Sequence, residues 1–169
     1  MLKSTINYNV LEEDFGDPTP EFFSSTTNST DNTQVSCHVT WTNKETHEII
    51  KQSISESPIY NGAISSRGPR YCPSIEDKVH KFYTKERHRI MLEPEGLKSE
   101  LIYPNGISTS LPLENQTVMI NSITGLEKAK IVQPGYAIEY DHIDPRALTN
   151  TLESKKINNL FFAGQINGT

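Results

Sequence analysis

The residues best suited to chemistry lie in one stretch, residues 68–78, which reads Gly-Pro-Arg-Tyr-Cys-Pro-Ser-Ile-Glu-Asp-Lys. The pattern predicts a loop that runs into the start of a helix. Gly68 allows close approach to the backbone, and Arg67 and Arg70 place positive charge beside the first free amides of that helix. This combination suits a phosphate or pyrophosphate, although an ordinary capped helix with solvated arginines explains the same residues.

Cys72 is the candidate nucleophile of the stretch. A helix start and nearby arginines stabilise a thiolate over a thiol, although an inert structural cysteine remains the alternative. Cys37 alternates with Val35 and Val39, so we expect it on the buried apolar face of a strand. Both thiols are expected to be reduced, as is usual inside cells.

Other kinds of site have little support in the sequence. His38 adjoins Cys37, but neighbours on a strand point to opposite faces and cannot easily share a metal ion. The other four histidines have no ligand spacing and are interpreted as single surface or capping residues; they are His47, His80, His88 and His142. The sequence contains neither a P-loop nor a Gly-x-Gly-x-x-Gly motif, so it does not encode a complete nucleotide-binding fold of the usual type.

Composition and charge narrow the class of protein further. The 169 residues have a net charge of −5, with 34% hydrophobic and 22% charged residues, which is typical of a globular domain. Residues 1–34 carry one base and six acids, whereas the remainder is balanced. A basic nucleic-acid-binding domain is therefore excluded on bulk charge, although a local patch is not. No apolar run could span a membrane or act as a signal peptide, so we expect a cytoplasmic protein without a membrane partner.

The helices and strands that must position these residues are predicted from the spacing of apolar residues and from the positions of Gly, Pro and capping residues. Residues 24–33 contain only Ser, Thr, Asn and one Asp, and predict a flexible loop. A capping box from Thr42 to Glu45 predicts a helix that ends before Pro58, and Pro73 starts a second helix that carries Ile75, Val79 and Phe82. The other expected elements are strands at 35–41, 89–92, 130–132, 136–140 and 160–163, a turn-rich stretch at 94–106, and a helix at 112–123 with Gly125 as its C′ residue.

These interleaved elements predict an α/β to α+β fold, with a mixed sheet and flanking helices. The last expected strand leads into a glycine-bearing turn, residues 164–169, that would normally open a helix facing an anion. No helix follows in the sequence, so we expect the chain to be a piece of a longer protein.

Several runs of residues, in the same order, resemble the tRNA uridine 5-carboxymethylaminomethyl modification enzymes, also called the glucose-inhibited division protein A family. The matching runs are residues 57–62, 68–79, 92–97, 103–112, 134–141, 151–155 and 161–169. The resemblance is strong over residues 35–169 and looser over the first 34.

The resemblance implies a homodimeric flavoprotein that acts on the wobble uridine of certain tRNAs together with a tRNA-modification GTPase. It implies FAD, NADH and a folate one-carbon donor, and a flavin-binding core of the glutathione-reductase type that is interrupted by inserted α/β segments. Cys72 matches one of the family's two functional cysteines, and Gln165 would touch FAD. The stretch assigned to the nicotinamide cofactor would be Gly68, Pro69, Arg70, Tyr71, Cys72, Pro73, Ser74, Ile75, Glu76, Asp77, Lys78, Val79, His80, Lys81 and Phe82.

This comparison divides the chain into three parts: a leading segment with a flexible loop at 1–34, an inserted nicotinamide-binding domain at 35–147, and a truncated return into the flavin core at 148–169. The family's glycine-rich FAD motif, its other cysteine and its helical C-terminal domain are missing from the sequence. We therefore expect this chain alone to hold no FAD and to be inactive. The alternative is a free-standing domain that binds a phosphate-bearing ligand or a protein without catalysis.

Overall fold

The structure is a computed structural model that describes residues 1–64 and 73–168. Within them, four strands form one antiparallel sheet in the order β1-β2-β3-β4. The strands are β1 (Glu12–Asp14), β2 (Cys37–Trp41), β3 (Arg89–Pro94) and β4 (Ile102–Asn105), and the helices are α1 (Lys44–Ser53), α2 (Ile75–Lys81) and α3 (Leu113–Asn121). Short 3₁₀ turns occupy Lys3–Thr5, Tyr8–Val10, Ile54–Glu56, Pro145–Ala147 and Gln165–Asn167. The fold is therefore α+β, and its sheet is antiparallel rather than mixed.

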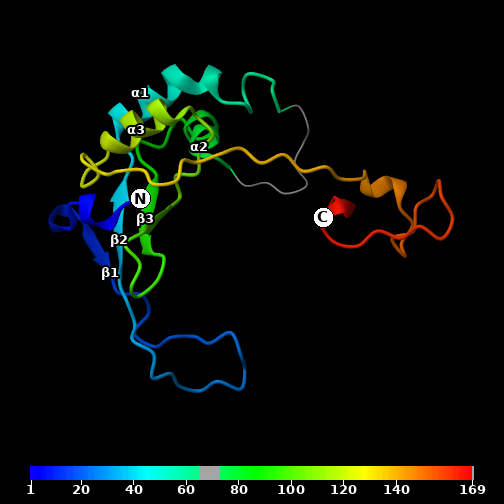
Figure 1. The fold of residues 1–169 in the computed structure, drawn as a ribbon, viewed down its shortest axis with the longest axis horizontal. Coiled ribbons are helices and arrows are strands. Elements are labelled where there is room, and N and C mark those ends of the chain that lie inside the picture. The colour runs from blue at the N-terminus through cyan, green and yellow to red at the C-terminus, as the bar shows by residue number, and fades with distance from the viewer. Residues whose placement is uncertain (65–72, 169) are drawn as a thin grey trace.

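The three helices pack on one face of the sheet, and the core lies between the two layers (Figure 1). Ile90 and Leu92 of β3 point into this core and are almost fully buried. Residues directly paired across an antiparallel ladder share a face, so their partners on β2, Thr40 and His38, face the core as well. Val39 of the predicted apolar face is buried, but Thr40 of the opposite face is buried as well, and the face of His38 and Thr40 is the one that turns toward the helices.

Cys37 and Trp41 consequently lie on the face of β2 that turns away from the helices. Neither belongs to the core cluster, and both are half-buried. Val35, expected on the buried face, is exposed and precedes the strand. The cause lies in β3, whose Ile90 and Leu92 are buried toward the helices, whereas Val39 and Trp41 are paired with Met91 and Arg89 on the other face.

The capping box of α1 lies one residue later than predicted. Asn43 accepts a hydrogen bond from the Thr46 amide at 2.9 Å, and the Thr46 hydroxyl accepts one from the Asn43 amide at 3.3 Å. Thr42 cannot cap the helix because its hydroxyl already accepts from the His88 amide at 2.8 Å and contacts Nε2 of His47 at 2.8 Å.

Two further helix boundaries differ from the predictions. The N-cap of α2 is Ser74 rather than a position set by Pro73, and Phe82 at its C-cap is 47% exposed instead of packed. Helix α3 ends at Asn121 with Ser122 as its C-cap, so Gly125 belongs to the following turn. It does adopt the positive φ, +82°, expected of a turn glycine.

Two strands were missed because their sequences resemble turns or an acidic linker. The stretch at 94–106, expected to be turns, contains β4, and Pro104 is tolerated there because β4 is an edge strand. The acidic leading segment supplies the other edge, β1, and Met1 and Ile6 enter the core. Residues 24–33 form an exposed loop, as predicted, between β1 and β2.

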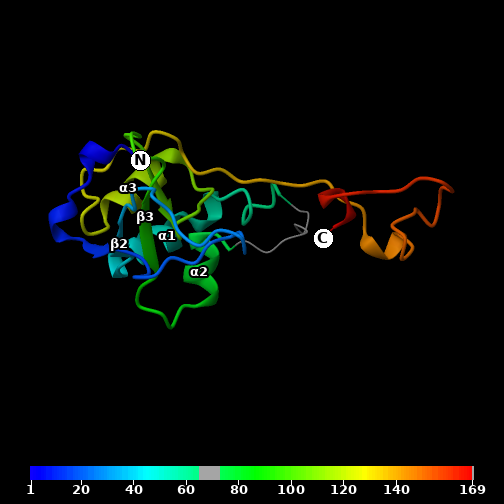
Figure 2. The ribbon, with the colours of Figure 1, turned by 90° about the horizontal axis from the view of Figure 1, so that it is seen from below.

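The three strands predicted near the C-terminus do not form. Residues 130–132 and 136–140 have no ladder partner, and at 160–163 there is only an isolated bridge between Phe161 and Glu153. Tyr136, Ile138 and Phe161 are more than half exposed. Residues 130–132 lie against the core, where Ile131 packs, whereas both ribbon views show the later part of the chain running away from the sheet and helices (Figures 1 and 2).

No helix within residues 1–64 and 73–168 combines the length and the apolar character needed to cross a bilayer.

Two histidines that are far apart in the sequence meet beneath the start of α1. The rings of His47 and His88 lie 5.4 Å apart and are buried, so the interpretation of these two as surface residues is wrong. Burial is the main cause that lowers the pKa of each below 6.5; Lys51 also lowers that of His47, and His47 itself lowers that of His88. Glu48 opposes the shift of His47.

Acidification should therefore destabilise the chain. Because the pKa of each histidine is lower when folded, the unfolded chain takes up protons first, and stability is lost as pH falls below about 6.5. Urea unfolding measures the free energy of unfolding at pH 7.5 and 5.5, which lie about one pH unit on either side of the ordinary histidine pKa. Between these values the His47→Gln variant should lose less of this free energy than wild type. His80→Gln, at an exposed position, should behave as wild type. Equal pH dependence in all three proteins would contradict the prediction.

Gly106, at the end of β4, should tolerate no side chain. Its φ is +100°, and an added Cβ would lie 2.6 Å from the carbonyl oxygen of Arg89. Gly62 is a matched control, because its φ is +84° with nothing within 4 Å of an added Cβ. We expect Gly62→Ala to lower the free energy of unfolding by about 1 kcal/mol. Gly106→Ala should lower it by about 3 kcal/mol or more. Chemical denaturation measures both, and equal losses would show that the backbone contact is unimportant.

Candidate functional site

The candidate cofactor stretch, residues 68–82, is described from Pro73 onward. Gly68, Pro69, Arg70, Tyr71 and Cys72 lie outside the described residues. The described part enters α2, where Ser74, Ile75, Glu76 and Val79 are buried and His80, Lys81 and Phe82 are exposed. Four of the ten described residues of this part, 73–82, are therefore buried in the packing around α2.

The first turn of α2 bonds to the protein itself. The Ser74 hydroxyl accepts from the Asp77 amide at 3.2 Å, and the Ile75 amide donates to the carbonyl oxygen of Ser108 at 2.7 Å. Glu76 and Asp77 add negative charge to the same turn. An anion bound by this stretch would consequently take its contacts mainly from residues before Pro73.

Glu76 is the buried centre of this region. Its side chain is fully buried, and its Oε1 accepts from the Thr109 hydroxyl at 3.0 Å and from the Ser110 amide at 3.1 Å. Its Oε2 has no hydrogen-bond partner among residues 1–64 and 73–168. The carboxylate thus joins α2 to the loop before α3, and the sequence offered no sign that this member of the stretch is structural.

A third segment joins the same region. Ser57 shares a hydrogen bond of 2.8 Å with the hydroxyl of Ser110, and the Tyr60 hydroxyl donates to Asp77 at 3.0 Å. Burial, and then the hydrogen bond to Asp77, raises the pKa of Tyr60 to about 12. Asp77 also forms an ion pair of 3.0 Å with Lys81.

Three of the runs singled out in the sequence, 57–62, 68–79 and 103–112, therefore meet around the start of α2. Sequence reasoning assigned no site role to Ser57, Tyr60, Thr109 and Ser110, although all four lie within those runs. The region as described holds polar groups in fixed positions and offers no nucleophile of its own. Its arrangement is suited to holding the start of α2 in place.

The other cysteine is poorly suited to nucleophilic chemistry. Cys37 is a free thiol, in agreement with the expected reduced state. Burial raises its pKa, and the nearby carboxylates of Glu93 and Asp14 raise it further. Because the thiolate is the reactive form, Cys37 should react slowly.

Gln165 lies in an exposed turn at the far end of the chain. It follows Gly164, whose φ is +88° and around which an added Cβ would meet nothing within 4 Å. The turn is anchored by the buried Asn167, which donates to the carbonyl oxygen of Phe162 at 3.1 Å. The side chain of Gln165 is thus free to contact a ligand or another part of a larger protein.

Within the described residues, no group of three or more His, Cys, Asp or Glu side chains is placed to hold a metal ion. The pair of His47 and His88 is the nearest approach to such a group, and Thr42 already bonds to both residues.

The chain resembles known proteins along its whole length. The family model of glucose inhibited division protein A matches residues 1–169. A curated relative from Buchnera aphidicola subsp. Cinara cedri, named tRNA uridine 5-carboxymethylaminomethyl modification enzyme MnmG, is 58% identical over 170 aligned positions. The alignment covers 100% of this chain and 27% of the relative, so the chain spans about a quarter of that protein.

Two crystal forms of GidA from Aquifex aeolicus have the same fold. Form I matches with a TM-score of 0.84 and 50% identity, over 99% of this chain and 29% of that one. Form II matches with a TM-score of 0.80 and 48% identity, over 99% of this chain and 27% of that one. With the fold, the sequence and the family model in agreement, the chain belongs to the glucose inhibited division protein A family.

Proposed function

We propose that this chain is part of an enzyme that uses FAD and NADH to modify the wobble uridine of certain tRNAs. With a tRNA-modification GTPase and a folate one-carbon donor, the enzyme would add a carboxymethylaminomethyl group to C5 of the base. The observation that carries this proposal is the 58% identity to a tRNA uridine-modifying enzyme over the entire chain. The aligned region covers the three segments that meet at α2.

The role of the chain in that enzyme follows from its parts. Residues 35–147 would form the nicotinamide-binding insert, and residues 148–169 would return to a flavin core of the glutathione-reductase type. The enzyme would be a cytoplasmic homodimer. Residues 1–14 pack on the same core as the insert, which supports placing them with it rather than with a separate linker.

The turn at Gln165 fits one edge of a flavin site. Gly168 packs closely on His142 and Ile143, whereas Gly164 and Gln165 face open space. This leaves the Gln165 amide available to hydrogen-bond a flavin, which would supply the redox chemistry when bound.

Residues 68–82 fit the nicotinamide cofactor through their first half. The buried Glu76 carboxylate and the Ser74 cap hold α2 in place, which would fix the point from which the preceding residues reach the cofactor. In this arrangement Arg70 would hold a cofactor phosphate, and Cys72 would act on the substrate.

The direct test is reconstitution with the intact protein. We expect purified protein, supplied with FAD, NADH, the GTPase partner and the folate donor, to convert the wobble uridine of a substrate tRNA. Nucleoside mass spectrometry measures the product. An unmodified wobble uridine under these conditions would contradict the proposed function.

The two cysteines offer a matched pair of variants. In the intact protein, Cys72→Ser should lower the modification rate by about 100-fold or more, because a serine hydroxyl is far less ionised than an activated thiol. Cys37→Ser should leave the rate within about two-fold, since Cys37 is half-buried with a raised pKa. Single-turnover rates give the comparison, and equal effects of both substitutions would remove Cys72 from catalysis.

Gln165 provides a test of the flavin contact. Gln165→Ala in the intact protein should raise the Kd for FAD about five-fold, as expected for one lost hydrogen bond. Gln52→Ala, on the exposed side of α1, should leave it unchanged. Flavin fluorescence titration measures both constants, and an unchanged Kd for the Gln165 variant would argue against the contact.

A further inference from the structure

Two hollows lie next to each other on the described surface, separated by the turn at Thr124 and Gly125. The first, the stacking hollow, has a volume of about 370 Å³ and is lined by Trp41, Arg87, Asn43, Glu12 and Thr124, among others. The second, the lysine hollow, has a volume of about 550 Å³ and is lined by Ser4, Thr5, Asn7, Glu127, Lys128 and Lys130, among others. Thr124 lines the stacking hollow and the next residue, Gly125, lines the lysine hollow, so the two hollows adjoin on the surface.

The stacking hollow lies where β1 and β2 separate. The ladder between these strands ends at the pair of Glu12 and Val39, so Trp41 extends beyond it. Trp41 is the only tryptophan of the chain, yet it is absent from the core cluster and half-buried. A large aromatic ring left outside the core at the rim of a hollow indicates a binding role.

Arg87 completes a flat, charged surface over this ring. Its guanidinium carbon lies 4.3 Å from the centroid of the Trp41 ring, and the side chain is exposed. Arg87 forms no ion pair with any residue in 1–64 or 73–168. The outer face of the guanidinium is therefore available for a further planar group.

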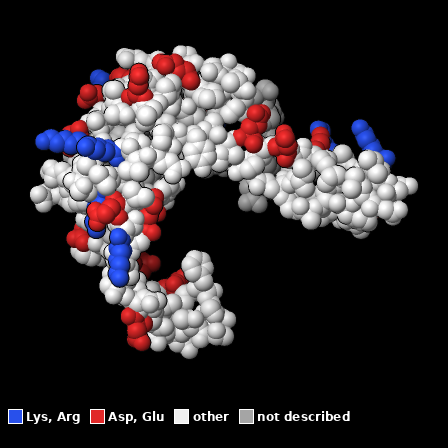
Figure 3. Space-filling model, viewed as in Figure 1, with Lys and Arg blue, Asp and Glu red and all other residues white. Residues whose placement is uncertain are grey.

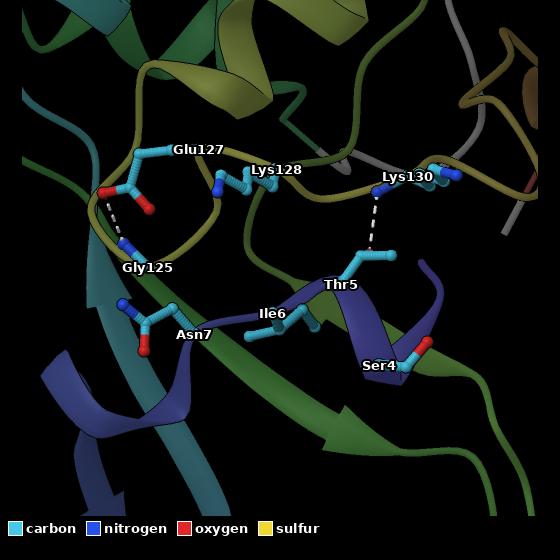
Figure 4. A pocket seen from close by; sticks show the side chains of 8 residues that line it. All are labelled: Ser4, Thr5, Ile6, Asn7, Gly125, Glu127, Lys128 and Lys130. Atoms are coloured by element: carbon cyan, nitrogen blue, oxygen red, sulfur yellow. Dashed lines mark hydrogen bonds between the residues drawn. The ribbon is translucent and has the colours of Figure 1, made fainter.

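The lysine hollow supplies cations beside that surface. Figure 4 shows Lys128 and Lys130 along one rim and Ser4, Thr5 and Asn7 along the other. Both lysines are exposed and form no ion pair with the described part of the chain. Basic side chains project from the left edge of the molecule, over the segment that follows α3 (Figure 3).

The two carboxylates of this surface, Glu12 and Glu127, leave it with one excess positive charge. Glu127 is engaged locally, because its Oε1 accepts from the Gly125 amide at 3.0 Å. Glu12 lines the stacking hollow without pairing with Arg87. Three cations thus share the surface with two carboxylates, within a chain whose residues beyond 34 are neutral as a whole.

A stacking platform next to unpaired cations is the combination that binds single-stranded nucleic acid. We propose that the stacking hollow and the lysine hollow bind a short unpaired segment of the RNA substrate. One base stacks on the Arg87 and Trp41 pair, and the adjoining phosphates lie over Lys128 and Lys130. This inference rests on the proposed function in tRNA modification. An acidic peptide could form ion pairs with the lysines, but it would place no planar base on the Arg87 and Trp41 pair.

The test uses the intact protein and the anticodon stem-loop of a substrate tRNA as the probe. Arg87→Lys keeps the charge but removes the planar face, and Trp41→Leu removes the ring beneath it. Each should weaken binding about 5- to 100-fold, the range expected for one lost stacked base. Arg146→Lys is the matched control, because Arg146 is exposed and paired with Asp144. Fluorescence anisotropy gives the affinities, and circular dichroism shows whether each variant is folded.

The lysines are tested through the salt dependence of the same binding. The double variant Lys128→Gln, Lys130→Gln should make the slope of log K against log salt shallower by about 0.7 for each lysine. Lys51→Gln, at an exposed position on α1, should leave the slope unchanged.

The outcomes separate this inference from the proposed function. If wild type binds and modifies the RNA but the Arg87 and lysine variants behave as their controls, the RNA site is overturned and the proposed function stands. If wild type neither binds the stem-loop nor modifies tRNA, both are overturned. Weaker binding by Arg87→Lys together with a shallower slope for the lysine variant supports the site.

Discussion

The alternation of side chains across one antiparallel ladder determines the layout of this molecule. Ile90 and Leu92 of β3 are buried against the helices, and their partners on β2 must share that face. Thr40 and His38 are thereby drawn toward the core, where Thr40 bonds to the carbonyl oxygen of Thr124. Trp41 and Cys37 are placed on the other side. A one-residue change of register would exchange the two sets, so the position of every β2 side chain depends on this pairing.

A second constraint acts at α2, where one buried carboxylate joins two segments. Glu76 holds the loop at Thr109 and Ser110, and Ser57 bonds to that same loop. The seven-residue helix is too short to be stable by itself, so these contacts hold it in place. This explains how so short a helix is held in place, and why Ser74, Ile75, Glu76 and Val79 of the stretch assigned to the cofactor are buried.

The two proposed ligand regions of the insert have different origins. The proposed cofactor stretch is continuous in sequence and includes α2, whereas the RNA surface combines residues from the leading segment, β2, the segment before β3 and the turn after α3. The net charge of the chain says little about the RNA surface, because that surface contains only three cations and depends on where they lie. A chain of nearly balanced charge can therefore still present a local site for a polyanion.

The amino-acid sequence by itself determined the family, the α1 and α2 helices and the β2 and β3 strands, because these depend on residues close together in the chain. Tertiary structure alone decided which face of β2 turns toward the helices, that Thr42 bonds to His47 and His88 instead of capping α1, and that 130–140 forms no strand. Each of these depends on partners distant in sequence: Ile90 and Leu92 for the face, His88 for the cap, and a missing ladder neighbour for the strand. Local pattern specifies an element and its period, whereas burial and pairing specify its face and its neighbours.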